Sequence, residues 1–197
     1  MFVVRGTCLG LYEIGVNRPM KYYQQIELNN LEIIKSKVLN ILNNDRQSHD
    51  FTHVYYPDEW SPYLEIPELI EELKRLCYYD YVFTIGLFVV MPNSPAPIHH
   101  DIGYKYSLNL PIQGCENTEV GFYISSQPAL EKRTVNGGKR FYQYEPEFCT
   151  KVDGFDMSTP AILNTSEPHN ITNNNPIGSL PRVTLLIRLK ETVGELF

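Results

Sequence analysis

The sequence lacks the features that take proteins into or across membranes. It has no uninterrupted run of about 18 apolar residues, which excludes a conventional membrane-spanning helix. The first residues are only mildly apolar, because Arg5 and Glu13 interrupt them, and they lack the basic-then-apolar order of a signal peptide. We therefore expect a cytoplasmic protein without membrane contact.

Cysteine is also scarce, and no two cysteines form a Cys-X-X-Cys pair. The four are widely spaced along the chain: Cys8, Cys77, Cys115 and Cys149. This spacing argues against a zinc ribbon and against a redox dithiol motif. We interpret the four as free thiols in a reducing compartment, although two disulfide bridges are formally possible.

Positive charge is deficient as well. The chain has 17 Lys and Arg against 23 Asp and Glu, which gives a net charge of −6. A balance of this sign provides no footprint for sequence-independent nucleic-acid binding. Tryptophan occurs once, whereas 14 tyrosines and nine phenylalanines favour a β-rich body.

Helical periodicity is confined to the first part of the chain. Apolar residues recur at helical spacing over 31–42, and Asn29 and Asn30 are suitable caps before them. A second helix is predicted over 66–76, because a proline in its first turn suits a helix start. The intervening residues 49–63 are aromatic and proline-bearing, and we expect them to be irregular.

From Tyr79 onward, short β-branched and aromatic segments alternate with turn residues, a pattern typical of strands. The predicted strands cover 81–91, 104–112, 120–125, 130–135, 140–144, 161–164, 169–172 and 183–189. Helices followed by many short strands predict a mostly β fold, an antiparallel sandwich or barrel with the N-terminal helices packed on one sheet. We expect a single domain over 1–197, with a helical part at 1–80 and a β core at 81–190.

The segment Pro97-Ile98-His99-His100-Asp101 has the spacing of a metal site. Residues two apart in a strand point to the same face, so His99 and Asp101 can reach one ion if the chain is extended there. His100 would point to the other face, where its partner at the same spacing is Ile102, which cannot bind a metal. We therefore expect His99 to be the ligand, and His100 to lie outside the site.

A third ligand has to come from a strand that is adjacent in space. His169 follows the turn signal Ser166-Glu167-Pro168 and precedes a β-branched residue. Two histidines and one carboxylate leave three octahedral positions open, an arrangement that suits non-haem Fe(II) with a chelating co-substrate and oxygen. Zinc more often has a closed tetrahedral set.

Arg182 opens the last predicted strand and supplies a planar guanidinium, which binds a carboxylate through two parallel hydrogen bonds. Thr184 lies two residues later and shares its face. We expect the strands of His169 and Arg182 to be antiparallel neighbours, so that both side chains open into one cavity. Arg188 shares the face as well and is an alternative anchor, but its place near the strand end favours a surface role.

Together, His99-His100-Asp101, His169 and Arg182-Val183-Thr184 resemble the Fe(II)/2-oxoglutarate-dependent dioxygenase superfamily. Residues 106–112 are similar to the strand after the first two ligands in the aspartyl/asparaginyl β-hydroxylase and free-proline hydroxylase branches. Those branches tend to carry an arginine and a histidine, two apart, where this chain has Ser107 and Asn109. The resemblance covers roughly residues 81–189.

The resemblance implies a double-stranded β-helix, or jelly roll. It also implies Fe(II) held by His99, Asp101 and His169, and 2-oxoglutarate anchored by Arg182 with help from Thr184. With O2, conversion of 2-oxoglutarate to succinate and carbon dioxide would be coupled to hydroxylation of an amino-acid side chain or a small molecule. Asn109 would either contact 2-oxoglutarate or satisfy neighbouring backbone groups.

Other interpretations stay open. A cupin-like jelly roll that binds metal without oxygenase activity, or an isomerase on that scaffold, would need no carboxylate anchor. A viral accessory protein on the same scaffold would bind no metal. The His100-Asp101 pair also occurs in helical metal phosphohydrolases, but here it lies between a proline-rich loop and a strand. Residues 45–63 and 126–140 are candidate lids, and neither substrate nor oligomeric state follows from the sequence.

Overall fold

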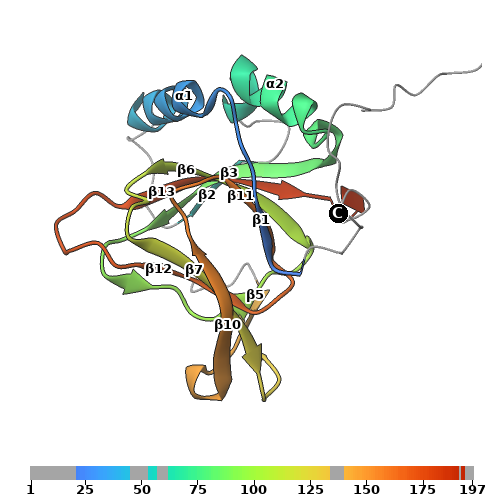
Figure 1. The fold of residues 1–197 in the computed structure, drawn as a ribbon, viewed down its shortest axis with the longest axis vertical. Coiled ribbons are helices and arrows are strands. Elements are labelled where there is room, and N and C mark those ends of the chain that lie inside the picture. Colours follow the sequence, from blue (N-terminus) through green and yellow to red (C-terminus); the bar gives the residue numbers. More distant parts are fainter. Residues whose placement is uncertain (1–20, 45–52, 57–61, 134–139, 191, 194–197) are drawn as a thin grey trace, which may run out of the picture.

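The computed structural model describes residues 21–44, 53–56, 62–133, 140–190 and 192–193. Two antiparallel sheets lie face to face, and two helices cover the outer side of one of them (Figure 1). This arrangement confirms the prediction of a mostly β sandwich with helices on one sheet. Within the described residues, no helix has the length and apolar character needed to span a bilayer.

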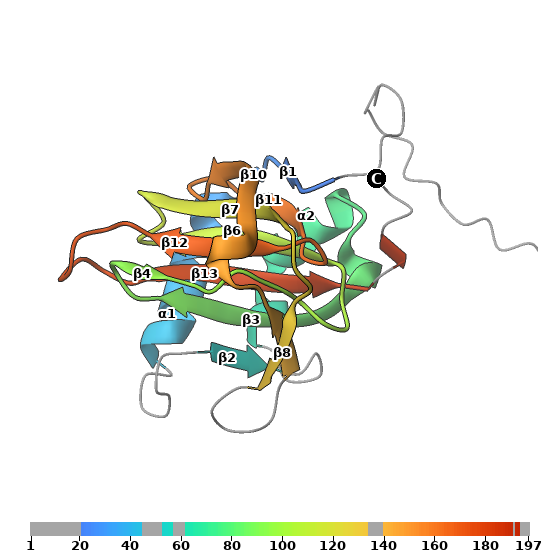
Figure 2. The same cartoon turned by 90° about the horizontal axis from the view of Figure 1, so that it is seen from below.

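The sheet under the helices has six strands in the order β1-β11-β6-β13-β3-β2. Their bounds are β1 (Tyr23–Gln25), β11 (Ala161–Asn164), β6 (Tyr106–Gln113), β13 (Arg182–Leu189), β3 (Val82–Val90) and β2 (His53–Tyr56). The longest strands, β3, β6 and β13, lie side by side in the centre, as the view in Figure 2 also shows for β3 and β13.

The opposing sheet has seven strands in the order β10-β7-β12-β5-β9-β8, with β4 paired to β12. Their bounds are β10 (Cys149–Asp156), β7 (Thr118–Ser125), β12 (His169–Asn173), β5 (His99–His100), β9 (Arg140–Gln143), β8 (Leu130–Arg133) and β4 (Ser94–Pro95). Three short 3-10 turns complete the described elements: η2 (Pro62–Glu65), η3 (Tyr79–Tyr81) and η4 (Pro146–Phe148).

Helices α1 (Leu31–Asn44) and α2 (Pro67–Arg75) occur where the periodicity predicts them. Each buries an apolar stripe against the six-stranded sheet, with Ile34 and Val38 from α1 and Leu69 and Leu73 from α2 in one core cluster. Full burial of such side chains contributes about 1.5–3 kcal/mol each. The helices therefore close one face of that sheet.

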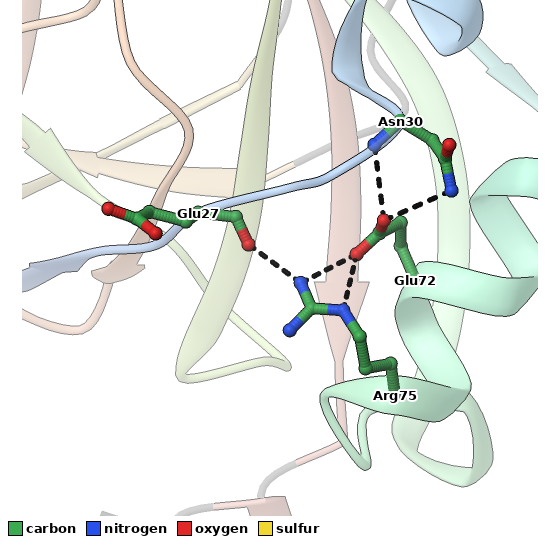
Figure 3. Close-up of polar contacts among 4 residues, drawn as sticks. All are labelled: Glu27, Asn30, Glu72 and Arg75. Atoms are coloured by element: carbon green, nitrogen blue, oxygen red, sulfur yellow. Dashed lines mark hydrogen bonds and ion pairs between the residues drawn. The ribbon is translucent and has the colours of Figure 1, made fainter.

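The start of α1 is fixed by α2 rather than by its own cap. The backbone N–H and the side-chain amide of Asn30 both donate to Oε1 of Glu72, at 3.2 Å each (Figure 3). Arg75 pairs with the other oxygen of Glu72 and also donates to the carbonyl of Glu27. Because Glu72 is almost fully buried, this network satisfies a carboxylate that would otherwise be costly.

Alternate residues of β13 give the six-stranded sheet two different faces. Val183, Leu185 and Ile187 point toward the helices and belong to the core cluster with them. Arg182 and Thr184 point toward the opposing sheet and are fully buried. Along β13, one face is thus apolar and the other polar. On the inner side, these polar residues lie beside a second apolar cluster, to which Val90 of β3 and Leu163 of β11 contribute.

Several local predictions were wrong. The first 80 residues also contribute two edge strands, since β1 pairs with β11 and β2 pairs with β3. The strand β2 lies within the segment expected to be irregular. The strand β10 gave no signal because its residues are mostly exposed and polar. The hairpin turn at 136–138 lies outside the described residues, although its two strands pair as predicted.

The strands of His169 and Arg182 are not neighbours in one sheet, contrary to expectation. The connection between them crosses the sandwich, so that β12 pairs with β7 and β5, whereas β13 pairs with β3 and β6. Sequence spacing cannot distinguish a hairpin from such a crossing. Both side chains nonetheless belong to facing layers.

The thiol prediction is right in part. Cys115 and Cys149 are free cysteines, whereas Cys77 is disulfide-bonded. Its partner lies outside the described residues. Spacing along the chain does not reveal pairing in space, which is why the sequence left this open.

Candidate functional site

Two imidazoles lie against each other on paired strands of the seven-stranded sheet. His99 on β5 is directly opposite His169 on β12, and their ring centroids are 4.5 Å apart. The strand that carries His99 is short because Pro95 and Pro97 lack the N–H groups that a continuous strand would donate. This pairing places His169 on a strand next to that of His99, as expected for the third ligand.

Both rings are held in the same tautomer. Nδ1 of His99 lies 2.8 Å from the carbonyl oxygen of Pro97, and Nδ1 of His169 lies 2.9 Å from that of Glu167. A carbonyl can only accept, so each Nδ1 carries a proton, and in the neutral form of each ring Nε2 keeps its lone pair. Backbone carbonyls orient metal-binding histidines in this way.

His169 is 3% exposed, and burial together with the neighbouring His99 lowers its pKa to about 4. The ring is therefore neutral at physiological pH, which is the form that binds a cation. His99 is more accessible, with 19% of its side chain exposed. The pair thus has one buried ring and one partly exposed ring.

Asp101 follows His99 on the same side, and its backbone N–H donates to the carbonyl of Thr165 at 2.9 Å. Its Oδ1 lies 3.9 Å from Nε2 of His99. Adjacent ligands of one ion, with bonds of about 2.1 Å, are separated by about 3 Å, so this pair would have to close by roughly 1 Å. In the described part of the chain, no three His, Cys, Asp or Glu side chains are already arranged to hold a metal.

His100 is directed elsewhere. Its Nδ1 lies 2.9 Å from the hydroxyl of Tyr144, and its ring stacks on Tyr142 at 4.8 Å. Burial lowers its pKa. These contacts occupy His100 within the sheet, away from the His99–His169 pair.

Arg182 is the largest fully buried side chain of the described residues. None of its three guanidinium nitrogens has a hydrogen-bond partner in that part of the chain, and its Cζ lies 5.8 Å from the centroid of the Phe88 ring. Burial lowers its pKa to about 10, so it still carries a proton at pH 7. A buried cation without a counter-charge costs several kcal/mol, and a carboxylate is the group that would relieve this cost.

The polar groups near Arg182 are uncharged. The buried hydroxyl of Thr184 also lacks a hydrogen-bond partner within the described residues. Burial raises the pKa of the nearby Cys115 thiol, and the Arg182 guanidinium opposes this rise, so the thiol remains neutral. Asn109 donates to the carbonyl and the hydroxyl of Ser107, which favours its structural interpretation.

Strand β12 relates the position of the imidazoles to that of Arg182. From His169, β12 runs to Asn173, whose amide donates to the carbonyl of Val90, the residue directly opposite Arg182. Four residues of strand span about 13 Å. An extended arginine and a five-carbon dicarboxylate together cover such a distance.

Two residues between the sheets were not predicted from the sequence to lie near the candidate site. Thr84 on β3 and Tyr104 after β5 lie on the inner side near Arg188, whose Cζ is 4.1 Å from the Tyr104 ring centroid. Arg188 is half-buried rather than at the surface as expected. The spacing of Arg182, Thr184 and Arg188, two or four residues apart on β13, was the feature of the sequence that indicated an inner position for Arg188.

Comparisons with known proteins give weak similarities. No family model and no curated protein matches the chain. Solved structures that resemble 86% of it include AviO1 from Streptomyces viridochromogenes Tue57 (TM-score 0.44, 12% identity, 89% of that chain). They also include HygX from Streptomyces hygroscopicus with nickel and 2-oxoglutarate bound (TM-score 0.49, 12% identity, 82% of that chain). A third is EvdMO1 (TM-score 0.46, 15% identity, 47% of that chain). Nothing about activity follows from similarities at this level.

Proposed function

We propose that this protein is an Fe(II)- and 2-oxoglutarate-dependent dioxygenase on a jelly-roll fold. In the proposed reaction, one oxygen atom of O2 enters the substrate as a hydroxyl group, and the other enters succinate as carbon dioxide leaves 2-oxoglutarate. The substrate is an amino-acid side chain or a small molecule.

The buried guanidinium of Arg182 is the observation that carries this proposal. A guanidinium binds carboxylates strongly, this one has no counter-charge among the described residues, and Thr184 offers a hydroxyl on the same face. A sandwich core has no structural need for such a cation, because its burial is costly. A co-substrate carboxylate would neutralise it and would accept two parallel hydrogen bonds.

The imidazole pair would supply the other end of the site. His99 and His169 each direct Nδ1 to a backbone carbonyl, which leaves Nε2 to bind a cation in the neutral ring, and Oδ1 of Asp101 lies 3.9 Å from Nε2 of His99. When bound there, Fe(II) would supply the oxygen chemistry. The protein would orient 2-oxoglutarate between Arg182 and the imidazoles, and the burial of His169 would keep water from that side.

Succinate formation tests the proposal. Purified protein with Fe(II), O2 and 2-oxoglutarate should form succinate, slowly even without substrate. His99→Ala and His169→Ala should abolish this reaction, and Arg182→Ala should raise the 2-oxoglutarate requirement at least 100-fold. His100→Phe is the matched control, because that ring lies outside the pair. Unchanged turnover in all three variants would refute the assignment.

A second candidate function is a jelly-roll module without oxygenase activity, either metal-binding or metal-free. One observation favours it: within the described residues the donors at 99, 101 and 169 are not preassembled as a metal site. Metal analysis of protein purified without oxygen separates the candidates. Stoichiometric iron together with 2-oxoglutarate binding supports the dioxygenase, whereas metal without 2-oxoglutarate binding, or no metal, supports the module.

A further inference from the structure

A second guanidinium lies on the inner face of β13, at the opposite end from Arg182. Arg188 is directly opposite Thr84 on β3 and directly opposite Ser107 on β6. Because residues opposite each other across a sheet point to the same side, these three side chains form one row across three adjacent strands. We call Thr84, Arg188 and Ser107 the inner polar row.

The inner polar row is rich in hydrogen-bond donors. The hydroxyl of Thr84 is buried and has no hydrogen-bond partner within the described residues. Ser107 is 1% exposed and accepts from the amide of Asn109 at 2.9 Å, which leaves its own proton to donate. Tyr104 packs against the Arg188 guanidinium and limits its freedom. The inner polar row therefore combines the guanidinium of Arg188, which packs on Tyr104, with two hydroxyl groups.

The row lies at the imidazole end of the sandwich. Ser107 is opposite Leu163 on β11, and the chain then turns from Asn164 into His169. Within that turn, Thr165 bonds to Lys105 on one side and accepts from the N–H of Asp101 on the other. The region that would accommodate a substrate next to the proposed metal is thus bordered by the inner polar row.

We propose that the inner polar row binds an oxyanion of the substrate, a carboxylate or a phosphate, and so restricts the enzyme to anionic substrates. This inference rests on the proposed function for the identity of the ligand as a substrate. A planar guanidinium flanked by hydroxyl donors matches the oxygen atoms of either group.

The co-substrate does not account for this row. Arg188 follows Arg182 by six residues of continuous strand, which separates their Cα atoms by about 20 Å. A five-carbon dicarboxylate is only about 5 Å long between its carboxylate carbons, given C–C bonds of about 1.5 Å. With one carboxylate on Arg182 and the other directed to the imidazoles, 2-oxoglutarate does not extend to Arg188.

Nitrogen-15 NMR of the arginine Nε–H groups tests the inference directly. The signal of Arg188 is assigned by its disappearance in Arg188→Lys, and the wild-type protein without metal is titrated with acetate, with inorganic phosphate and with neutral acetamide at matched ionic strength. We expect a saturable shift with acetate, with phosphate or with both, and none with acetamide. The stronger of the two anions indicates the substrate's acidic group.

Two variants and one competitor sharpen the result. Thr84→Val should weaken anion binding about three- to tenfold, because one donor is lost. Lys190→Gln removes an exposed positive charge at the end of the same strand and should leave binding unchanged. Three results overturn the inference: no shift with either anion, an equal shift with acetamide, or displacement of the anion from Arg188 by 2-oxoglutarate.

The outcome is separable from that of the proposed function. Anion binding at Arg188 without succinate formation would leave the anion site standing and remove the dioxygenase assignment. Succinate formation without anion binding at Arg188 would leave the dioxygenase assignment standing and remove the anion site.

Discussion

The two faces of strand β13 are built by alternate residues of one strand, yet their chemistry is opposite. Leu185 and Ile187 face the helices in a fully apolar core, whereas Thr184 and Arg182 face the second sheet with polar atoms that lack hydrogen bonds within the described residues. The apolar face stabilises the fold, whereas the polar face costs free energy. We infer that the polar face is retained for binding.

The largest effect on stability should come from the helix-facing side. Leu185→Ala should lower the free energy of unfolding by about 2–5 kcal/mol, because it opens a cavity beneath the helices. Urea unfolding measures this. The neighbouring Thr184→Val keeps the shape but removes an unpaired hydroxyl, so it should be neutral or slightly stabilising. Equal losses in the two variants would abolish the contrast between the faces.

Acid should destabilise the metal-free protein because His169 is buried in its neutral form. The pKa of His169 is about 4 in the folded state and about 6.5 unfolded, so between these values only the unfolded state binds the proton. The free energy of unfolding should therefore fall by roughly 3 kcal/mol as pH drops from 6.5 to 4. The measurement is the difference between wild type and His169→Gln, which lacks this titration. Parallel pH profiles would contradict it.

Removing the inner cation should stabilise the ligand-free protein. Arg182→Met replaces a buried guanidinium by an apolar chain of similar length and should raise the free energy of unfolding by about 1–3 kcal/mol. Arg75→Met is the matched control, because that arginine pairs with Glu72, and its loss should be destabilising. Thermal and urea unfolding without 2-oxoglutarate decide this. A destabilised Arg182→Met would mean that the guanidinium serves the fold.

The smallest effect is expected at the edge of the helical layer. Asn30→Ala removes the amide that donates to Glu72 and should lower the free energy of unfolding by about 1 kcal/mol. Succinate formation should not change, because this contact lies on the helical side of the sheet (Figure 3). A loss of activity without a loss of stability would show that the two faces are coupled.

The sequence predicted the elements with strong periodicity. Both helices and the central strands β3, β6 and β13 occur where apolar spacing placed them, since these elements bury their side chains in the core. The strand β10 was invisible because its exposed residues show no apolar alternation. The crossing between β12 and β13 was missed because connection length does not reveal which sheet the chain joins next.

The candidate site was predicted from residue types that bind metals or carboxylates and from their spacing, not from apolar periodicity. His99, Asp101, His169 and Arg182 were selected by residue type and spacing, and the structure brings the two imidazoles together and buries Arg182. Thr84 and Tyr104 had no motif, and their place beside Arg188 follows only from strand register. Whether the four selected residues bind iron and 2-oxoglutarate stays a prediction.

Ligand-dependent stability tests the central claim most directly. Unfolding of wild type and Arg182→Met is measured without oxygen, with Fe(II) alone and with Fe(II) plus 2-oxoglutarate. A ligand at 100 times its Kd stabilises the folded state by about 2.7 kcal/mol. We predict a gain of that order on adding 2-oxoglutarate to the wild type and almost none for Arg182→Met. An equal gain in both proteins, or no gain in the wild type, would contradict the claim that the buried guanidinium is a carboxylate anchor.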